Sequence, residues 1–176
     1  MTAAIDTERL TLRLHGLGDF PDSLAMWSDP AVTRYIGGRP STEEEVWQRL
    51  LRYAGHWSLM GFGYWAVRER ESGRFAGEVG FAVGKRPLEP SFGDAPELGW
   101  ALVPALHGRG YATEAVRAAI TWGQSRFGPD RRTVCMIHPE NLPSLRVAEK
   151  AGYRELARTT YKGEPTILFE RGGAAR

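Results

Sequence analysis

Two glycines flank an arginine at the point where a strand pattern changes into a helix pattern. Gly108, Arg109 and Gly110 follow the apolar segment ELGWALVP and precede GYATEAVRAAITWG, which has helical spacing. The first turn of a helix has backbone N–H groups without internal partners, and glycine lets a ligand approach them closely. The segment is therefore a candidate phosphate cradle, to which Arg109 would add a charge-assisted contact. A glycine-rich turn that binds nothing is the alternative.

A second polar pair begins another expected helix. Asn141 and Ser144 stand at the start of NLPSLRVAEKAG, directly after the strand pattern RTVCMIH. Ser144 shares a helix face with Val147 and Ala148, so its hydroxyl is expected to point inward. The alternative is that Asn141 and Ser144 only cap the helix, which is the usual role of these residue types.

Other binding motifs are absent from the sequence. It contains neither a G-x-x-x-x-G-K-[ST] segment nor a G-x-G-x-x-G segment after a first strand, which argues against a P-loop or a dinucleotide-binding fold. Cys135 lies in an alternating strand pattern and is expected in the core. The histidines form no cluster with metal-ligand spacing, so no metal site is expected. These are His15, His56, His107 and His138.

Hydrophobic periodicity predicts the elements that position these residues. Strands are expected over 8–14, 63–69, 74–83, 97–103, 132–138, 152–161 and 165–170, and helices over 19–27, 41–57, 110–128 and 141–152. The order β-αα-βββ-α-β-α-ββ predicts a mixed α/β (α+β) fold built on one sheet.

The second helix is predicted in more detail. Ser41 and Glu44 match an S-x-x-E capping box, and Asp29-Pro30 is expected to end the helix before it. Its expected buried stripe is Val46, Trp47, Leu50, Leu51, Ala54 and Trp57. Among the tryptophans, Trp27, Trp47 and Trp122 are expected in the core, and Trp57 and Trp65 are candidates to line a substrate cleft.

Composition limits the class of protein. The 176 residues, 42% hydrophobic and 25% charged, predict one folded domain over 1–176 with a frayed tail at 171–176. A net charge of +2 argues against nucleic-acid binding. One cysteine, no long apolar run and no secretory signal pattern favour a cytoplasmic protein without a membrane span.

Taken together, the two polar segments resemble the GNAT superfamily of acetyl-CoA-dependent N-acetyltransferases. The family's cofactor motif, Q/R-x-x-G-x-G/A, is matched by HGRGYA at 107–112. Its later motif, an Asn, a Ser three residues on and then K-x-G-aromatic, is matched by Asn141, Ser144 and KAGY at 150–153. GYATEA and TERLTLR are most similar to the RimJ/RimL-type ribosomal-protein N-terminal acetyltransferases. His107 departs from the family's Gln or Arg, which leaves a backbone cradle intact.

The resemblance implies direct transfer of an acetyl group from acetyl-CoA to an amine. It also implies that the strand ending at Pro104 splays away from the next strand, and that the thioester enters between them. Pantetheine would pair with backbone near Leu102 and Val103 and would bond to Asn141. The pyrophosphate would bind the amides of Gly108, Arg109, Gly110, Tyr111, Ala112 and Thr113.

The resemblance assigns the chemical roles as well. Ser144 would protonate the departing thiolate, with Tyr111 and Tyr153 as alternatives. A backbone N–H near Leu102 would stabilise the oxyanion.

The sequence leaves the proton acceptor and the amine open. Glu97 alternates with Leu98 and Trp100 and so faces away from that apolar row, which makes it the first candidate base. Glu78, water alone and a merely salt-bridged Glu97 are the alternatives. The amine, in a protein N-terminus or a small molecule, would meet 34–40, 85–96 and the final hairpin. A monomer and a homodimer are both compatible with the sequence. The competing function is a non-catalytic coenzyme A sensor.

Overall fold

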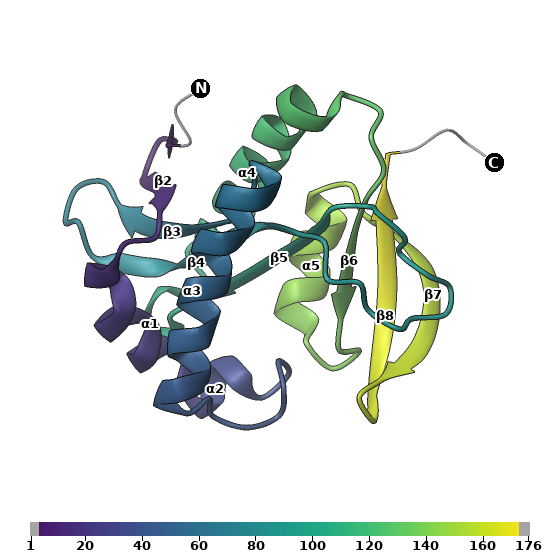
Figure 1. Ribbon diagram of the computed structural model, residues 1–176, viewed down its shortest axis with the longest axis horizontal. Helices are drawn as coiled ribbons and strands as arrows, with labels where there is room; N and C mark the ends of the chain where they lie inside the picture. Colours follow the sequence, from purple (N-terminus) through teal and green to yellow (C-terminus); the bar gives the residue numbers. More distant parts are fainter. Residues whose placement is uncertain (1–3, 173–176) are drawn as a thin grey trace.

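One mixed sheet with helices on both faces organises the molecule, and the computed structural model describes residues 4–172 (Figure 1). The eight strands formed by these residues lie in the order β1-β2-β3-β4-β5-β6-β8-β7. Neighbouring strands are antiparallel except β5 and β6, which are parallel. The strands are β1 (Ile5–Asp6), β2 (Leu10–Leu14), β3 (Tyr64–Glu69), β4 (Phe75–Ala82), β5 (Glu97–Leu102), β6 (Thr133–Ile137), β7 (Arg154–Tyr161) and β8 (Glu164–Arg171).

The helices are divided between the two faces of the sheet. They are α1 (Phe20–Trp27), α2 (Pro30–Thr33), α3 (Glu43–Met60), α4 (Tyr111–Phe127) and α5 (Leu142–Lys150). On β3, Ala66 packs in a cluster with α1 and α3, whereas its neighbours Trp65 and Val67 pack with the buried face of α4 and with α5. Because successive strand residues point to opposite faces, α1 and α3 cover one face and α4 and α5 cover the other.

The expected mixed fold and its order of elements are confirmed, with two additions. The two-residue strand β1 pairs with β2 and is too short to give a periodic signal. Asp29-Pro30 ends α1 as expected but also begins α2, because Asp29 Oδ1 accepts a hydrogen bond from Ala31 N at 2.8 Å. Proline at the first helical position is compatible with a helix start.

The predicted start of α3 was wrong by one residue. Thr42, not Ser41, is the N-cap: its hydroxyl accepts from Glu45 N at 3.2 Å, and Glu45 Oε2 accepts from Thr42 N at 2.8 Å. The expected stripe was also partly wrong, because the helix buries Val46, Leu50 and Tyr53 while the side chains of Trp47 and Leu51 are exposed.

Other expectations about single residues had mixed outcomes. Trp65 is fully buried in the core, so it does not line a cleft. Trp27 and Cys135 are buried as expected, and burial raises the pKa of the Cys135 thiol. Arg171 belongs to β8 rather than to a frayed tail, and 173–176 lie outside the described residues.

The centre of the sheet opens between its two parallel strands. Along the described chain, β5 and β6 share a single register pair, Glu97 with Val134, next to the bond from Val134 N to Pro96 O at 3.0 Å. Beyond it β5 continues along β4 to Leu102, and β6 continues along β8 to Ile137. The splayed pair of strands that the resemblance implied is therefore present.

No helix within 4–172 combines the length and apolarity needed to cross a bilayer. Across the same residues, no group of three or more His, Cys, Asp and Glu side chains is arranged to hold a metal ion.

Candidate functional site

The end of β5 directs backbone polar groups into the opening. Val103 N donates to Ala76 O of β4 at 3.0 Å, so the Val103 N–H is used within the sheet. In an antiparallel pair, alternate residues face the partner strand and the others face away. The N–H and C=O groups of Leu102 therefore face β6. The Leu102 carbonyl accepts a hydrogen bond from His107 Nε2 at 2.9 Å. His107, which departs from the family motif, therefore has a contact within the turn.

The turn after β5 supplies free amides. Gly108 has φ +74° and Gly110 has φ +79°, left-handed conformations that favour glycine. Gly110 is the N-cap of α4 and has no side chain to satisfy the helix. Within 4–172 no acceptor binds the N–H groups of Tyr111, Ala112 or Thr113. These first-turn amides are available to an anionic ligand.

Residues from the start of the chain hold this turn. Arg9 donates through Nη1 to the carbonyl of Arg109 at 2.9 Å and through Nε to Glu114 Oε2 at 2.7 Å. Thr7 Oγ1 donates to Glu114 Oε1 at 2.6 Å. Burial alone would raise the pKa of Glu114, but the hydrogen bonds from Thr7 and Arg9 outweigh it and lower that pKa. The Arg109 side chain is exposed.

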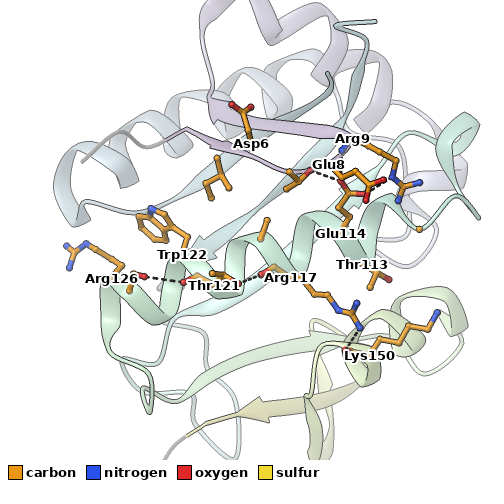
Figure 2. A pocket seen from close by; sticks show the side chains of 15 residues that line it. Asp6, Glu8, Arg9, Thr113, Glu114, Arg117, Thr121, Trp122, Arg126 and Lys150 are labelled. Atoms are coloured by element: carbon orange, nitrogen blue, oxygen red, sulfur yellow. Dashed lines mark hydrogen bonds and ion pairs between the residues drawn. The ribbon is translucent and has the colours of Figure 1, made fainter. Parts of the chain in front are cut away.

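An open groove of about 970 Å³ adjoins the turn and runs along the outer side of α4. Figure 2 shows α4 with Arg9 on one side and Lys150 on the other. Gly110, Thr113 and Arg117 line it, and Arg117 Nη2 donates to the Lys150 carbonyl at 3.3 Å. The start of α4 therefore borders a groove of mixed charge, lined by the cationic side chains Arg9, Arg117, Arg126 and Lys150 and by the acidic side chains Asp6, Glu8 and Glu114.

Asn141 and Ser144 lie at the start of α5. Asn141 Oδ1 accepts from Ser144 N at 3.3 Å, so Asn141 caps the helix. Ser144 is half-buried, on the side of α5 that buries Ala148. Among the described residues its hydroxyl has no hydrogen-bond partner, which leaves it available for other contacts.

The two alternative tyrosines are already engaged. Tyr111 donates its hydroxyl to Glu69 Oε1 at 2.9 Å. The Tyr153 hydroxyl is buried and lies 2.9 Å from Thr133 Oγ1. A shift of either hydroxyl towards a ligand would break a hydrogen bond, so Ser144 is the less constrained group.

Glu97 lies on the face of β5 opposite Leu98, as predicted. Its side chain is 10% exposed, and Oε2 accepts from Arg86 Nε at 2.6 Å. Arg86 Nη1 also donates to the Tyr161 hydroxyl at 3.0 Å. Burial disfavours the charged form of Arg86, yet its contacts with Glu97 raise its pKa. Glu97 is thus a salt-bridged carboxylate with one further oxygen.

Glu78, the second candidate base, is completely enclosed. Its carboxylate accepts from Ser23 Oγ at 3.0 Å, from Trp27 Nε1 at 3.0 Å and from Tyr53 Oη at 2.9 Å. His15 Nε2 lies 3.4 Å from Oε1, outside hydrogen-bond geometry. Burial alone would raise the pKa of Glu78, but these contacts together lower it. Its oxygens are therefore occupied by structural donors.

The segments expected on the substrate side meet around the end of β6. Tyr35 stacks on His138, with ring centroids 5.1 Å apart, and His138 Nε2 lies 3.9 Å from Glu164 Oε2 at the start of β8. The connection 83–96, whose Arg86 reaches Tyr161, crosses in front of β8 in Figure 1. All three segments thus border one region of the face covered by α1 and α3.

Sequence reasoning missed Tyr64, which lies in this region. A Cβ placed on Gly99 would collide with the Tyr64 hydroxyl and would lie 3.1 Å from its Cζ atom, so the ring reaches from β3 across β4 to β5. Tyr53 stacks on it, with ring centroids 4.7 Å apart. The available signal was Gly99 itself, since a glycine inside a strand often marks a close approach.

Comparisons with known proteins agree with this geometry. The model of the acetyltransferase (GNAT) domain family matches residues 9–154. A GNAT-family acetyltransferase from Bordetella pertussis is 33% identical with a TM-score of 0.83, over 96% of this chain and 99% of that one. The uncharacterized N-acetyltransferase p20 of Bacillus licheniformis is 29% identical over 150 residues, 85% of this chain and 81% of that protein.

A more distant match shares the fold. The ribosomal L7/L12 α-N-protein acetyltransferase RimL, solved in complex with coenzyme A, has a TM-score of 0.76 at 17% identity, over 96% of this chain and 97% of that one.

We predict that Glu78→Gln lowers the free energy of unfolding at pH 7 by about 3 kcal/mol or more, because buried donors lose their charged acceptor. A carboxyl whose pKa falls on folding stabilises the folded state above its usual value of 4.5, and that stabilisation disappears as the pH drops below it. Urea unfolding between pH 6 and pH 3 should therefore show a steeper loss for the wild type than for the variant. Exposed Glu155→Gln is the control, and equal losses in both variants would contradict the prediction.

Proposed function

Because the chain belongs to the GNAT acetyltransferase family, whose model matches residues 9–154, we propose that it transfers an acetyl group from acetyl-CoA to a primary amine. The observation that carries the proposal is that β5 leaves the Leu102 N–H facing the opening towards β6 and is followed directly by the turn that leaves the amides of Tyr111, Ala112 and Thr113 free. The free amides can bind the phosphate groups of coenzyme A while β5 binds its extended pantetheine arm. The coenzyme A complex of RimL, a protein of the same fold, supports this choice.

In this proposal the turn binds the pyrophosphate and β5 binds the pantetheine arm. The amides from Gly108 to Thr113 donate to phosphate oxygens, assisted by the exposed Arg109. The Leu102 N–H faces the opening and pairs with the arm, whereas the Val103 N–H already bonds to β4. Asn141, at the start of α5, donates to the arm through its side-chain amide.

The chemical step needs a neutral amine, a stabilised oxyanion and a protonated leaving group. Glu97 takes the proton from the ammonium, directly or through water, and the amine nitrogen then attacks the thioester carbonyl. A second N–H of β5 near Leu102, that of Trp100, also faces away from β4 and stabilises the resulting oxyanion. When the C–S bond breaks, Ser144 donates its proton to the thiolate. The second proton of the attacking nitrogen then passes to Ser144, directly or through water, as the amide forms, and Glu97 releases its proton to solvent.

Binding of acetyl-CoA should depend on backbone access at Gly110. Gly110→Val should lower affinity at least about tenfold, because a side chain there obstructs the amides and one charge-assisted bond is worth about 1.5–3 kcal/mol. Arg109→Ala should cost about 1–2 kcal/mol. Gly73→Val is the control, since Gly73 also has positive φ but lies in the β3–β4 turn. Titration calorimetry measures the acetyl-CoA affinity of all three variants. Undiminished binding by Gly110→Val would contradict the proposed phosphate site at these amides.

Ser144→Ala should slow the chemical step without weakening the fold. Loss of a general acid typically costs about 10²–10⁴ in rate, and the hydroxyl makes no hydrogen bond within the described chain that would be lost. The measurements are kcat from thiol release, acetyl-CoA affinity and Tm. A variant with a lower Tm but an unchanged kcat would show that Ser144 has a structural role instead.

Glu97→Gln should preserve acetyl-CoA affinity and lower kcat/KM most at low pH. The deficit should shrink as the pH rises towards the pKa of the amine, because the amine then loses its proton unaided. The loss of kcat/KM should be larger for a lysine-like amine, whose pKa is about 10.4, than for an α-amine, whose pKa is about 7.8. The test is a pH–rate profile of both enzymes with one amine. A deficit independent of pH would make Glu97 a positioning residue.

The function itself is tested with acetyl-CoA and a panel of amines, with release of free thiol as the readout. Thiol release together with an acetylated amine supports transfer. Tight binding of acetyl-CoA without thiol release for any amine would instead support the coenzyme A sensor.

A further inference from the structure

Tyr64 places a hydroxyl beside β5 on the side from which an amine would approach. Its ring covers Gly99, two residues after Glu97, on the same face of that strand. Within the described residues the hydroxyl has no hydrogen-bond partner. Burial is the main cause that raises its pKa, followed by the negative charge of Glu97, so the phenol stays protonated. Tyr64 therefore offers a neutral polar group next to the proposed base.

Three arginines from two elements lie close enough to Tyr64 for their charges to act on its hydroxyl. Arg49 and Arg52 belong to α3, and Arg86 belongs to the connection between β4 and β5. All three charges act on the pKa of Tyr64, in the direction opposite to Glu97. Arg52 lies against the neighbouring Tyr53, with its guanidinium carbon 5.9 Å from the ring centroid.

The arginines are incompletely paired. Arg86 binds Glu97, but among residues 4–172 neither Arg49 nor Arg52 forms an ion pair. The Arg49 guanidinium lies 3.8 Å from the centroid of Trp27, and its Nε is buried without a hydrogen-bond partner. The nearby carboxylates are Glu97, bound to Arg86, and the buried Glu78, whose negative charge acts on Arg49. Three arginines thus face two carboxylates, which leaves one positive charge in excess around Tyr64.

We propose that the amine substrate carries an anionic group, a carboxylate or a phosphate, which Arg49 and Arg52 bind while Glu97 and Tyr64 receive the amine. This proposal rests on the acetyl transfer proposed above and specifies its substrate class. Guanidinium groups match the geometry of both anions and form stronger bonds with them than with neutral acceptors. An amine without an anion leaves the excess positive charge uncompensated.

The test compares matched amines. α-Amino acids are paired with their amides, and phosphoethanolamine is paired with ethanolamine, so that carboxylate and phosphate are tested separately. A nearby negative charge keeps an amine protonated, so an enzyme without an anion site would favour the neutral member. We expect higher kcat/KM for the anionic member of at least one pair.

A variant assigns the preference to the arginines. Arg52 is exposed, so Arg52→Gln is expected to fold, and Tm checks this. It should lower kcat/KM for the anionic amine by about 10- to 100-fold and change the neutral partner less than about twofold. Arg158→Gln, which removes an exposed charge paired with Glu155 on β7, is the control and should affect neither.

Three outcomes would overturn the proposal: preference for neutral amines, no turnover of any anionic amine, or equal effects of Arg52→Gln on both members of a pair. Calorimetry with acetyl-CoA separates these outcomes from failure of the proposed function. A protein that binds acetyl-CoA and acetylates only neutral amines keeps the transferase function and loses the anionic substrate. A protein that does not bind acetyl-CoA loses both.

Discussion

A parallel strand pair that separates after one register position leaves backbone hydrogen-bonding groups unpaired in the middle of a sheet. Such groups need partners, and β5 and β6 satisfy theirs only in part: His107 binds the carbonyl of Leu102, while the Leu102 N–H faces the opening. The sheet stays together because the outer edge of each strand is held in an antiparallel ladder, with β4 on one side and β8 on the other. The two outer ladders therefore hold the strands on either side of the opening, and its polar edge favours a ligand with hydrogen-bonding groups.

A buried charge organises the other side of the same region. The Glu78 carboxylate on β4 receives hydrogen bonds from Ser23 and Trp27 of α1 and from Tyr53 of α3, so one side chain fixes two helices to the sheet. Tyr53 in turn stacks on Tyr64, whose ring lies against Gly99. The wall next to β5 is thus positioned by a carboxylate that cannot itself reach a substrate. A group that looked like a second base in the sequence is a structural anchor.

Local patterns predicted most of the fold because strands and helices here have clear periods and clear stop signals. The N-cap predicted at Ser41 was wrong because Thr42 and Glu45 form the same pattern one residue later. Only the geometry distinguishes these two overlapping capping boxes. The predicted buried stripe of α3 was partly wrong because Trp47, although apolar, faces solvent. The turn after β5 was predictable from its glycines. The partners of Glu97 and Glu78 were not, because Arg86, Tyr53 and Ser23 reach them through tertiary contacts that spacing does not encode.

The strand order β6-β8-β7 has a consequence for how the chain is made. The last strand in the sequence, β8, lies inside the sheet beside β6, and the earlier β7 takes the outer edge. During synthesis β6 can pair with β5 at one register position only, and its other edge stays open until β8, which begins at Glu164, has been made. Unpaired strand edges promote association with other chains. A chain released from the ribosome before Glu164 would therefore lack the strand that holds β6 beside the opening, and it would expose a strand edge in that place.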